Sequence, residues 1–121
     1  MRITTRGVRP EGGAWIIRWT VANDGDDPLL ILRAVAPHSR FRADEQEVAA
    51  DIPAAGEAEV SLPVHVHHSG DDVEDASLIL DARSGGLDWR ILAHLRVRTA
   101  DGMPQPRTER IDVQQGGVTE S

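Results

Sequence analysis

The chain has no cysteine and no lysine, and aromatic residues make up only 3% of its 121 residues. Without cysteine it can form neither a disulfide nor a thiolate zinc site, and thiol catalysis is excluded. All thirteen basic residues are arginine. Genomic base composition can produce that bias, so we attach no function to it.

Long hydrophobic runs are also missing. The longest aliphatic run is Leu29 to Leu32, which is far too short to cross a bilayer. No apolar stretch follows Met1–Arg6, so we expect no signal peptide and a soluble, cytoplasmic protein. The net charge of -7 and the pI near 5.1 argue against nucleic acid or an anionic membrane as a partner, because phosphates would be repelled.

The clearest organising feature is a strand predicted over Trp15 to Asn23. Its large apolar residues recur at every second position, which places them on one face of a pleated strand. Arg18 and Thr20 fall on the opposite face, so the strand is expected to be buried on one side only. The inward row is Trp15, Ile17, Trp19 and Val21.

Further strands are predicted along the rest of the chain, separated by clusters of glycine, proline and aspartate, and no helical period of useful length is present. We therefore predict an all-β, antiparallel, Ig-like (fibronectin-like) β-sandwich of seven to eight strands, with residues 1–113 as one domain and 114–121 as a polar tail. The remaining predicted strands are Ile3–Val8, Leu29–Ala36, Phe41–Val48, Glu57–His68, Ala76–Arg83, Trp89–Thr99 and Thr108–Val113. Pro63 suggests that its strand is an edge or irregular there.

Two turn sequences resemble those of a known group of domains. The segment Val21–Ile31 is similar to the V-x-N-x-G-x-x-P-L-x-I signature of bacterial Ig-like domains of the ASH and CARDB type. Ile52–Val60 is similar to their I-x-P-G-x-x-x-x-V turn, with Ala54-Ala55 in place of the strict Pro-Gly pair. The likeness covers roughly residues 15 to 98. It implies an Ig-like fold and a binding or scaffolding role, and it says little else about function.

A candidate contact face follows from the Ig-like strand order, in which the third, sixth and seventh strands share one sheet. We expect the inward residues to be Leu30, Leu32, Leu78, Leu80, Ile91 and Leu95. The outer face then has an aliphatic centre, where an outer face should be mostly polar. An aliphatic centre with an arginine-rich rim is typical of a protein–protein contact. The aliphatic residues are Ile31, Val35, Ile79 and Leu92, and their charged or polar neighbours are Arg33, Asp81, Arg90, His94 and Arg96.

The expected partner of this face is another protein or a second copy of the chain. Two alternatives remain open. Gly102–Val113 could fold back over the aliphatic residues, or a stripe of Arg90, Arg96 and Arg98 could bind a carboxylate or phosphate. In that second case Glu57, Glu59 and Asp81 would compete as internal partners.

A small metal-binding protein is the alternative function. His65 and His67 are two residues apart and beside His68, a spacing that can chelate zinc or copper, and His38 or His94 could add a ligand. Asp71–Asp75 lacks the Asp-x-Asp-x-Asp-Gly pattern of calcium-binding loops, so we expect it to be a solvated acidic loop. No serine-elbow, Walker or dinucleotide motif is present. We therefore expect a non-enzymatic protein without a cofactor.

Overall fold

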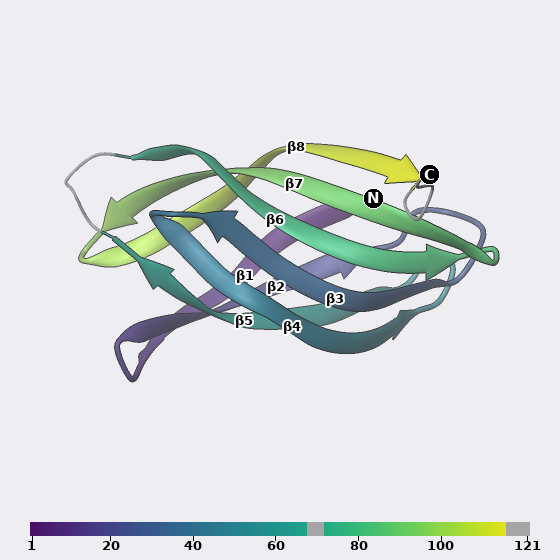
Figure 1. The fold of residues 1–121 in the computed structure, drawn as a ribbon, viewed down its shortest axis with the longest axis horizontal. Coiled ribbons are helices and arrows are strands. Elements are labelled where there is room, and N and C mark those ends of the chain that lie inside the picture. Colours follow the sequence, from purple (N-terminus) through teal and green to yellow (C-terminus); the bar gives the residue numbers. More distant parts are fainter. Residues whose placement is uncertain (68–71, 116–121) are drawn as a thin grey trace.

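The computed structural model describes residues 1–67 and 72–115, which form eight strands (Figure 1). In this part of the chain no helix is long and apolar enough to cross a membrane. The strands are β1 (Arg2–Glu11), β2 (Ala14–Ala22), β3 (Leu29–His38), β4 (Phe41–Ile52), β5 (Glu57–Val66), β6 (Val73–Ser84), β7 (Leu87–Ala100) and β8 (Met103–Gln115).

All strand pairs are antiparallel, in the order β1-β2-β5-β4-β3-β6-β7-β8. Figure 1 shows β3, β4, β6, β7 and β8 in front of β1, β2 and β5. β4 and β5 join the two layers only at Phe41↔Val66 and Arg42↔His65. On the other side β1 lies beside β8, where the Thr5 hydroxyl donates to the Pro106 carbonyl at 2.8 Å. The result is a nearly closed, barrel-like sheet, and the all-β antiparallel prediction is confirmed.

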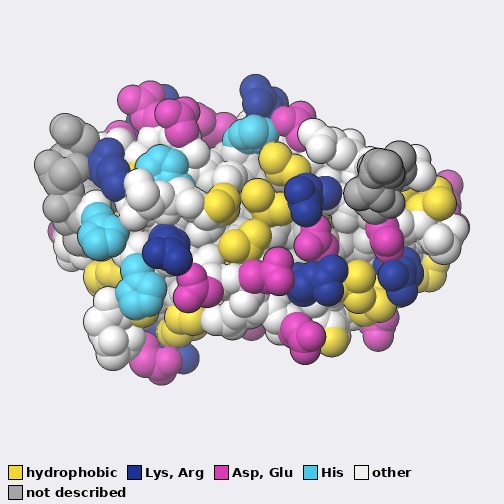
Figure 2. Space-filling view, in the orientation of Figure 1, with side chains coloured by type: hydrophobic (Ala, Val, Ile, Leu, Met, Phe, Trp, Pro, Cys, Tyr) yellow, Lys and Arg dark blue, Asp and Glu magenta, His cyan; other side chains and the backbone are white. Residues whose placement is uncertain are grey.

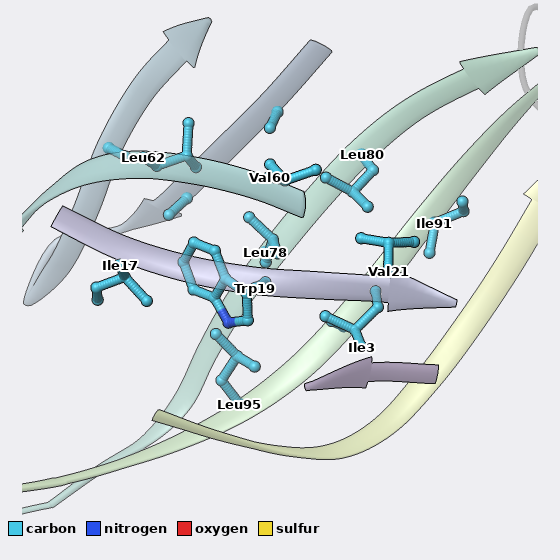
Figure 3. Close-up of a cluster of buried hydrophobic side chains, with 14 of the residues drawn as sticks. Ile3, Ile17, Trp19, Val21, Val60, Leu62, Leu78, Leu80, Ile91 and Leu95 are labelled. Carbon is cyan, nitrogen blue, oxygen red and sulfur yellow. The ribbon is translucent and has the colours of Figure 1, made fainter. Parts of the chain in front are cut away.

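The core lies between the two layers and follows the two-residue alternation. Ile17, Trp19 and Val21 of β2 are fully buried, as predicted. In Figure 3 the indole of Trp19 lies among aliphatic side chains of both layers, including Leu78 and Leu95. The same alternation buries the predicted inward residues of β5 and β7, among them Val60, Leu62, Val64, Ile91, Ala93, Leu95 and Val97.

The first half of β3 reverses the predicted orientation. Ile31 is fully buried and Leu29 is nearly so, whereas Leu30 and Leu32, expected inside, are partly exposed. The cause is a β-bulge: Ile31 pairs with Ala82 of β6, and the next pair is Arg33 with Asp81. Leu32 is therefore an extra residue, and one extra residue exchanges the two faces of a strand.

Several strand limits also differ from the prediction. β4 continues to Ile52, and β8 continues through Gln115 into the predicted tail. Val73–Asp75, predicted as the end of an acidic loop, begins β6. The part of that loop at residues 68–71 lies outside the described residues, as does 116–121. Pro63 lies where β5 pairs with β2 but not with β4, in agreement with its predicted edge position.

Asn23 connects the two chain crossings between the layers at one end of the molecule. It is 6% exposed and is the one buried polar residue in the described part of the chain. Its backbone N–H donates to the Gly56 carbonyl at 2.8 Å. Its side-chain amide donates to the carbonyls of Asp27 (2.8 Å), Pro53 (3.3 Å) and Ile52 (3.4 Å) and accepts from the Gly25 N–H (3.0 Å). The β2–β3 and β4–β5 connections are thereby held together.

The β4–β5 turn also departs from the glycine pattern of the signature. Ala55 has φ of 60°, in the left-handed region that favours glycine. Gly56 does not have positive φ, but a Cβ placed there would lie 2.7 Å from Cγ of Pro53. The first position therefore carries backbone strain, and the second needs glycine for space.

We expect Ala55→Gly to raise the free energy of unfolding by up to about 1 kcal/mol, because glycine removes the left-handed penalty. Gly56→Ala should lower it by about 1–3 kcal/mol through overpacking against Pro53. Urea denaturation of the two variants beside the wild type measures both changes. Equal effects of the two substitutions would contradict this account of the turn.

Asp24 follows Asn23 and forms an ion pair in the same turn. The N-terminal ammonium lies 2.9 Å from its Oδ2, and Arg2 is 3.7 Å from its Oδ1. The hydrogen bond from the ammonium, assisted by its charge and that of Arg2, lowers the pKa of this carboxyl below its ordinary value of 3.8. The folded state favours the ionised form of Asp24, so its ion pair with the N-terminal ammonium stabilises the fold fully at pH values above the ordinary pKa. This contribution is lost as the pH falls through the lowered pKa of the folded state.

Asp24→Asn is accordingly expected to lower the denaturation midpoint at pH 6, with the difference from wild type shrinking towards about pH 2. Asp26→Asn is the matched control, because Asp26 lies in the same turn without an ion pair among the described residues. Denaturant midpoints measured across the pH range provide the comparison. A wild-type advantage that grows in acid would refute the assignment.

Candidate functional site: the outer face of β3, β6 and β7

The outer face of the five-stranded layer carries a row of aliphatic side chains. The strands β3, β6 and β7 are neighbours, as predicted, and Val35 pairs with Ile79, which pairs with Leu92. All three are partly exposed. Figure 2 shows hydrophobic side chains in the middle of this face, with arginines and carboxylates around them. β8 extends the row by placing Asp112 opposite Leu92.

One side of the aliphatic row is bordered by ion-paired charges. Arg33, Asp81 and Arg90 lie in register on β3, β6 and β7. The Asp81 carboxylate is 3.5 Å from Nε of Arg33 and 3.3 Å from Nε of Arg90. Two guanidinium groups thus share one carboxylate, and surface pairs of this kind add little to stability. Their effect is to fix the charges around the apolar centre.

The opposite side of the row carries a second cluster, on β7 and β8. Nε2 of His94 is 2.8 Å from Asp112 Oδ2, and Arg110 is 3.5 Å from the same oxygen. Arg96 lies further along β7, between Glu74 of β6 at 3.0 Å and Glu109 of β8 at 3.4 Å. Charged groups of both signs therefore surround the aliphatic centre.

Eight of the nine residues predicted for this face lie on it: Val35, Ile79, Leu92, Arg33, Asp81, Arg90, His94 and Arg96. The prediction for Ile31 is wrong, because the bulge at Leu32 turns Ile31 into the core. Asp112 and Arg110 were not predicted for this face, because they reach it only through the pairing of β8 with β7. The alternation of Thr108–Val113 predicted a strand there but not its neighbour.

The structure bears on both alternatives for this face, the covering segment Gly102–Val113 and the anion-binding arginine stripe. Residues 103–115 pair with β7 at its edge as β8, beside the aliphatic row rather than over it. Each arginine of the proposed anion stripe already has a carboxylate: Arg90 has Asp81, Arg96 has Glu74, and Arg98 has Asp72 at 3.5 Å. These internal partners weaken the case for a free anion at an open hollow of about 600 Å³ that Arg96 and Arg98 line.

The histidines of the proposed metal site lie at another corner. His65 and His67 line an open hollow of about 830 Å³ where β4 leaves β5, and His68 lies outside the described residues. The expected third ligands are elsewhere engaged: Nδ1 of His38 accepts from the Arg40 N–H, and His94 contacts Asp112. Within the described ranges no three His, Asp or Glu side chains are grouped to hold a metal ion.

Comparisons with protein-family models, curated proteins and solved structures found no match. The likeness to ASH and CARDB domains therefore rests on the two turn sequences alone. Any function has to be argued from the geometry of this chain.

One pair of substitutions tests the inward placement of Ile31 against the outward placement of Leu92. Ile31→Arg should lower the free energy of unfolding by more than about 4 kcal/mol, or prevent folding, because it buries an unpaired charge. Leu92→Arg should change it by less than about 1 kcal/mol, because the new side chain can extend into water. Urea denaturation and circular dichroism of both proteins measure the difference. Comparable destabilisation by the two substitutions would contradict the assigned faces.

Proposed function

We propose that this protein is a non-enzymatic protein-interaction module or small accessory subunit that binds a protein through the outer face of β3, β6 and β7. The observation that carries the proposal is the row of Val35, Ile79 and Leu92, an apolar centre within a charged border. Contacts between proteins are commonly apolar at the centre and polar at the rim. Contiguous apolar surface of this kind is a marker of such contacts.

The other layer supplies an internal comparison. Its outward positions are polar apart from Ile16 and Pro63, which pair with each other, and the small residues Ala14 and Ala22 at the ends of β2, which are buried. The outward residues of β5, for example, are Glu57, Glu59, Ser61, Pro63 and His65. One sheet of the same protein therefore follows the usual pattern of a solvated face, and the other departs from it.

The distribution of polar groups supports a binding role over catalysis. Acid–base catalysts are usually tuned by burial or by close charged neighbours in a cleft. In the described part of the chain the one buried polar residue is Asn23, whose hydrogen bonds are used by the two connections.

We also propose that the fold is an Ig-like sandwich with one added strand. The neighbours β1-β2-β5 and β4-β3-β6-β7 correspond to the two sheets expected for a fibronectin-like domain. β8 would then be an extra strand beside β7, which approaches β1 and narrows the open side.

The functional proposal is tested by capture with matched variants. Wild-type protein, Leu92→Arg and Leu87→Arg are immobilised in equal amounts, exposed to lysate of the source cells, and the captured proteins are quantified by mass spectrometry. Leu87 is 45% exposed at the β6–β7 hairpin, so its variant introduces the same charge away from the aliphatic row. Each captured protein is then purified and its affinity measured directly.

We expect Leu92→Arg to weaken binding of such a partner at least about tenfold, since an unpaired charge would enter the centre of the contact, while Leu87→Arg leaves it unchanged. Capture that is equal for all three proteins would place the contact elsewhere. If no protein is captured and the chain does not self-associate, the proposed function is refuted.

A further inference from the structure

We infer that the partner of this face is a second copy of the chain, packed face to face with the first about a two-fold axis. The axis lies midway between the two faces, runs parallel to β6 and β7, and passes over the line between these two strands. The inference rests on the proposed function and adds the identity of the partner and the geometry of the contact. A two-fold contact requires one patch to be complementary to itself. The register of β6 and β7 meets that requirement.

Two cross-strand pairs on these strands are the basis of the argument. Ile79 of β6 lies opposite Leu92 of β7, and Asp81 of β6 lies opposite Arg90 of β7. All four side chains project from the outer face. Each strand thus contributes one aliphatic residue and, two residues away on the same face, one charged residue. The charge is negative on β6 and positive on β7.

Rotation by 180° about the stated axis exchanges the positions of β6 and β7. Ile79 of one copy then lies over Leu92 of the other copy, and Asp81 lies over Arg90 of the other copy. Within these two pairs apolar groups meet apolar groups and the carboxylate meets a guanidinium. At the two ends of the row, on β3 and β8, Val35 of one copy would lie over Asp112 of the other copy. At the next level, Ser77 of β6 would lie over His94 of β7, which is also a compatible polar pair.

A different two-fold axis gives a poorer match. Suppose instead that the axis ran across the strands, along the row from Ile79 to Leu92. The border of one copy that contains Asp81 and Arg90 would then lie over the border of the other copy that contains His94. Arg90 would then lie over His94, and Asp81 over Ser77. The axis parallel to the strands is therefore favoured, because it alone of these two pairs Asp81 with Arg90.

The charge balance of the border agrees with this arrangement. Within one copy, Arg33 and Arg90 share the carboxylate of Asp81, which is only 25% exposed. In the dimer Arg90 would gain a second carboxylate, from the other copy. A contact of standard size covers about 800 Å² per partner, a small part of the 6918 Å² accessible surface of the chain.

The test combines the solution mass with cross-linking. Sedimentation equilibrium of the full chain over a concentration series should show a species of twice the 13.2 kDa mass. Leu92→Arg should raise the dimer dissociation constant at least about tenfold, and the matched variant Leu87→Arg should leave it unchanged. Circular dichroism of each variant verifies that it is folded.

Cross-linking then examines the axis. Because the chain has no cysteine, Ile79→Cys and Leu92→Cys each introduce one defined thiol. Face-to-face sheets lie about 10 Å apart, too far for a direct disulfide, so a short bis-maleimide is used. In an equal mixture, with one variant carrying a size tag, random association alone gives twice as much 79–92 pairing as either like pairing. The 79–92 product should therefore exceed the 79–79 and 92–92 products taken together. Ser61→Cys on the other layer, mixed with Leu92→Cys, is the control and should yield little product.

Each outcome has a distinct meaning. A monomer at all concentrations overturns the inference, while the proposed function survives if capture of another protein depends on Leu92. A dimer that persists in Leu92→Arg refutes the choice of face. A dimer that Leu92→Arg disrupts, but in which 79–79 and 92–92 products dominate, overturns the axis and retains the proposed function.

Discussion

The arrangement of the two layers depends on the hydrogen bonds of Asn23. The chain passes from one layer to the other between β2 and β3, and returns between β4 and β5. Asn23 joins these two passages through its backbone and its side-chain amide. A buried amide is costly unless its hydrogen bonds are made, and here both its donor and acceptor are used. The same contacts that satisfy Asn23 therefore set how β3 and β5 enter their layers.

The predictable part of the structure is the part in which alternation is marked by polar residues. In β2, β5 and β7 a charged or polar residue stands between most apolar ones, so the inward face could be assigned before the fold was known. In β3 the run Leu29–Leu32 carries no such marker. The bulge at Leu32 therefore left no trace in the hydrophobic pattern, and the face of Ile31 was assigned wrongly while that of Arg33 and Val35 was right.

The outer face could be predicted only in part, because its composition depends on strand neighbours that lie far apart in the sequence. The neighbours β3, β6 and β7 followed from the Ig-like strand order. β8 did not, since Pro104 and Pro106 weaken its strand pattern and nothing local indicates that it pairs with β7. Asp112 and Arg110 were missed for that reason, although they contribute charge beside Leu92 and His94.

The closure of the sheet also bears on how this protein can associate. Exposed strand edges are the usual route to pairing between chains, but β1 and β8 approach each other here. The described part of β4 beyond Arg42 has no pairing with β5, and it carries Asp44, Glu45, Glu47 and Asp51. Those carboxylates would repel each other if two such edges met. The edge of β5 from Glu57 to Val64 is also unpaired with β4, and it carries Glu57, Glu59 and Pro63, which likewise oppose pairing between edges. Edge pairing between copies is thus disfavoured, in agreement with the proposal that the contact is made through the outer face.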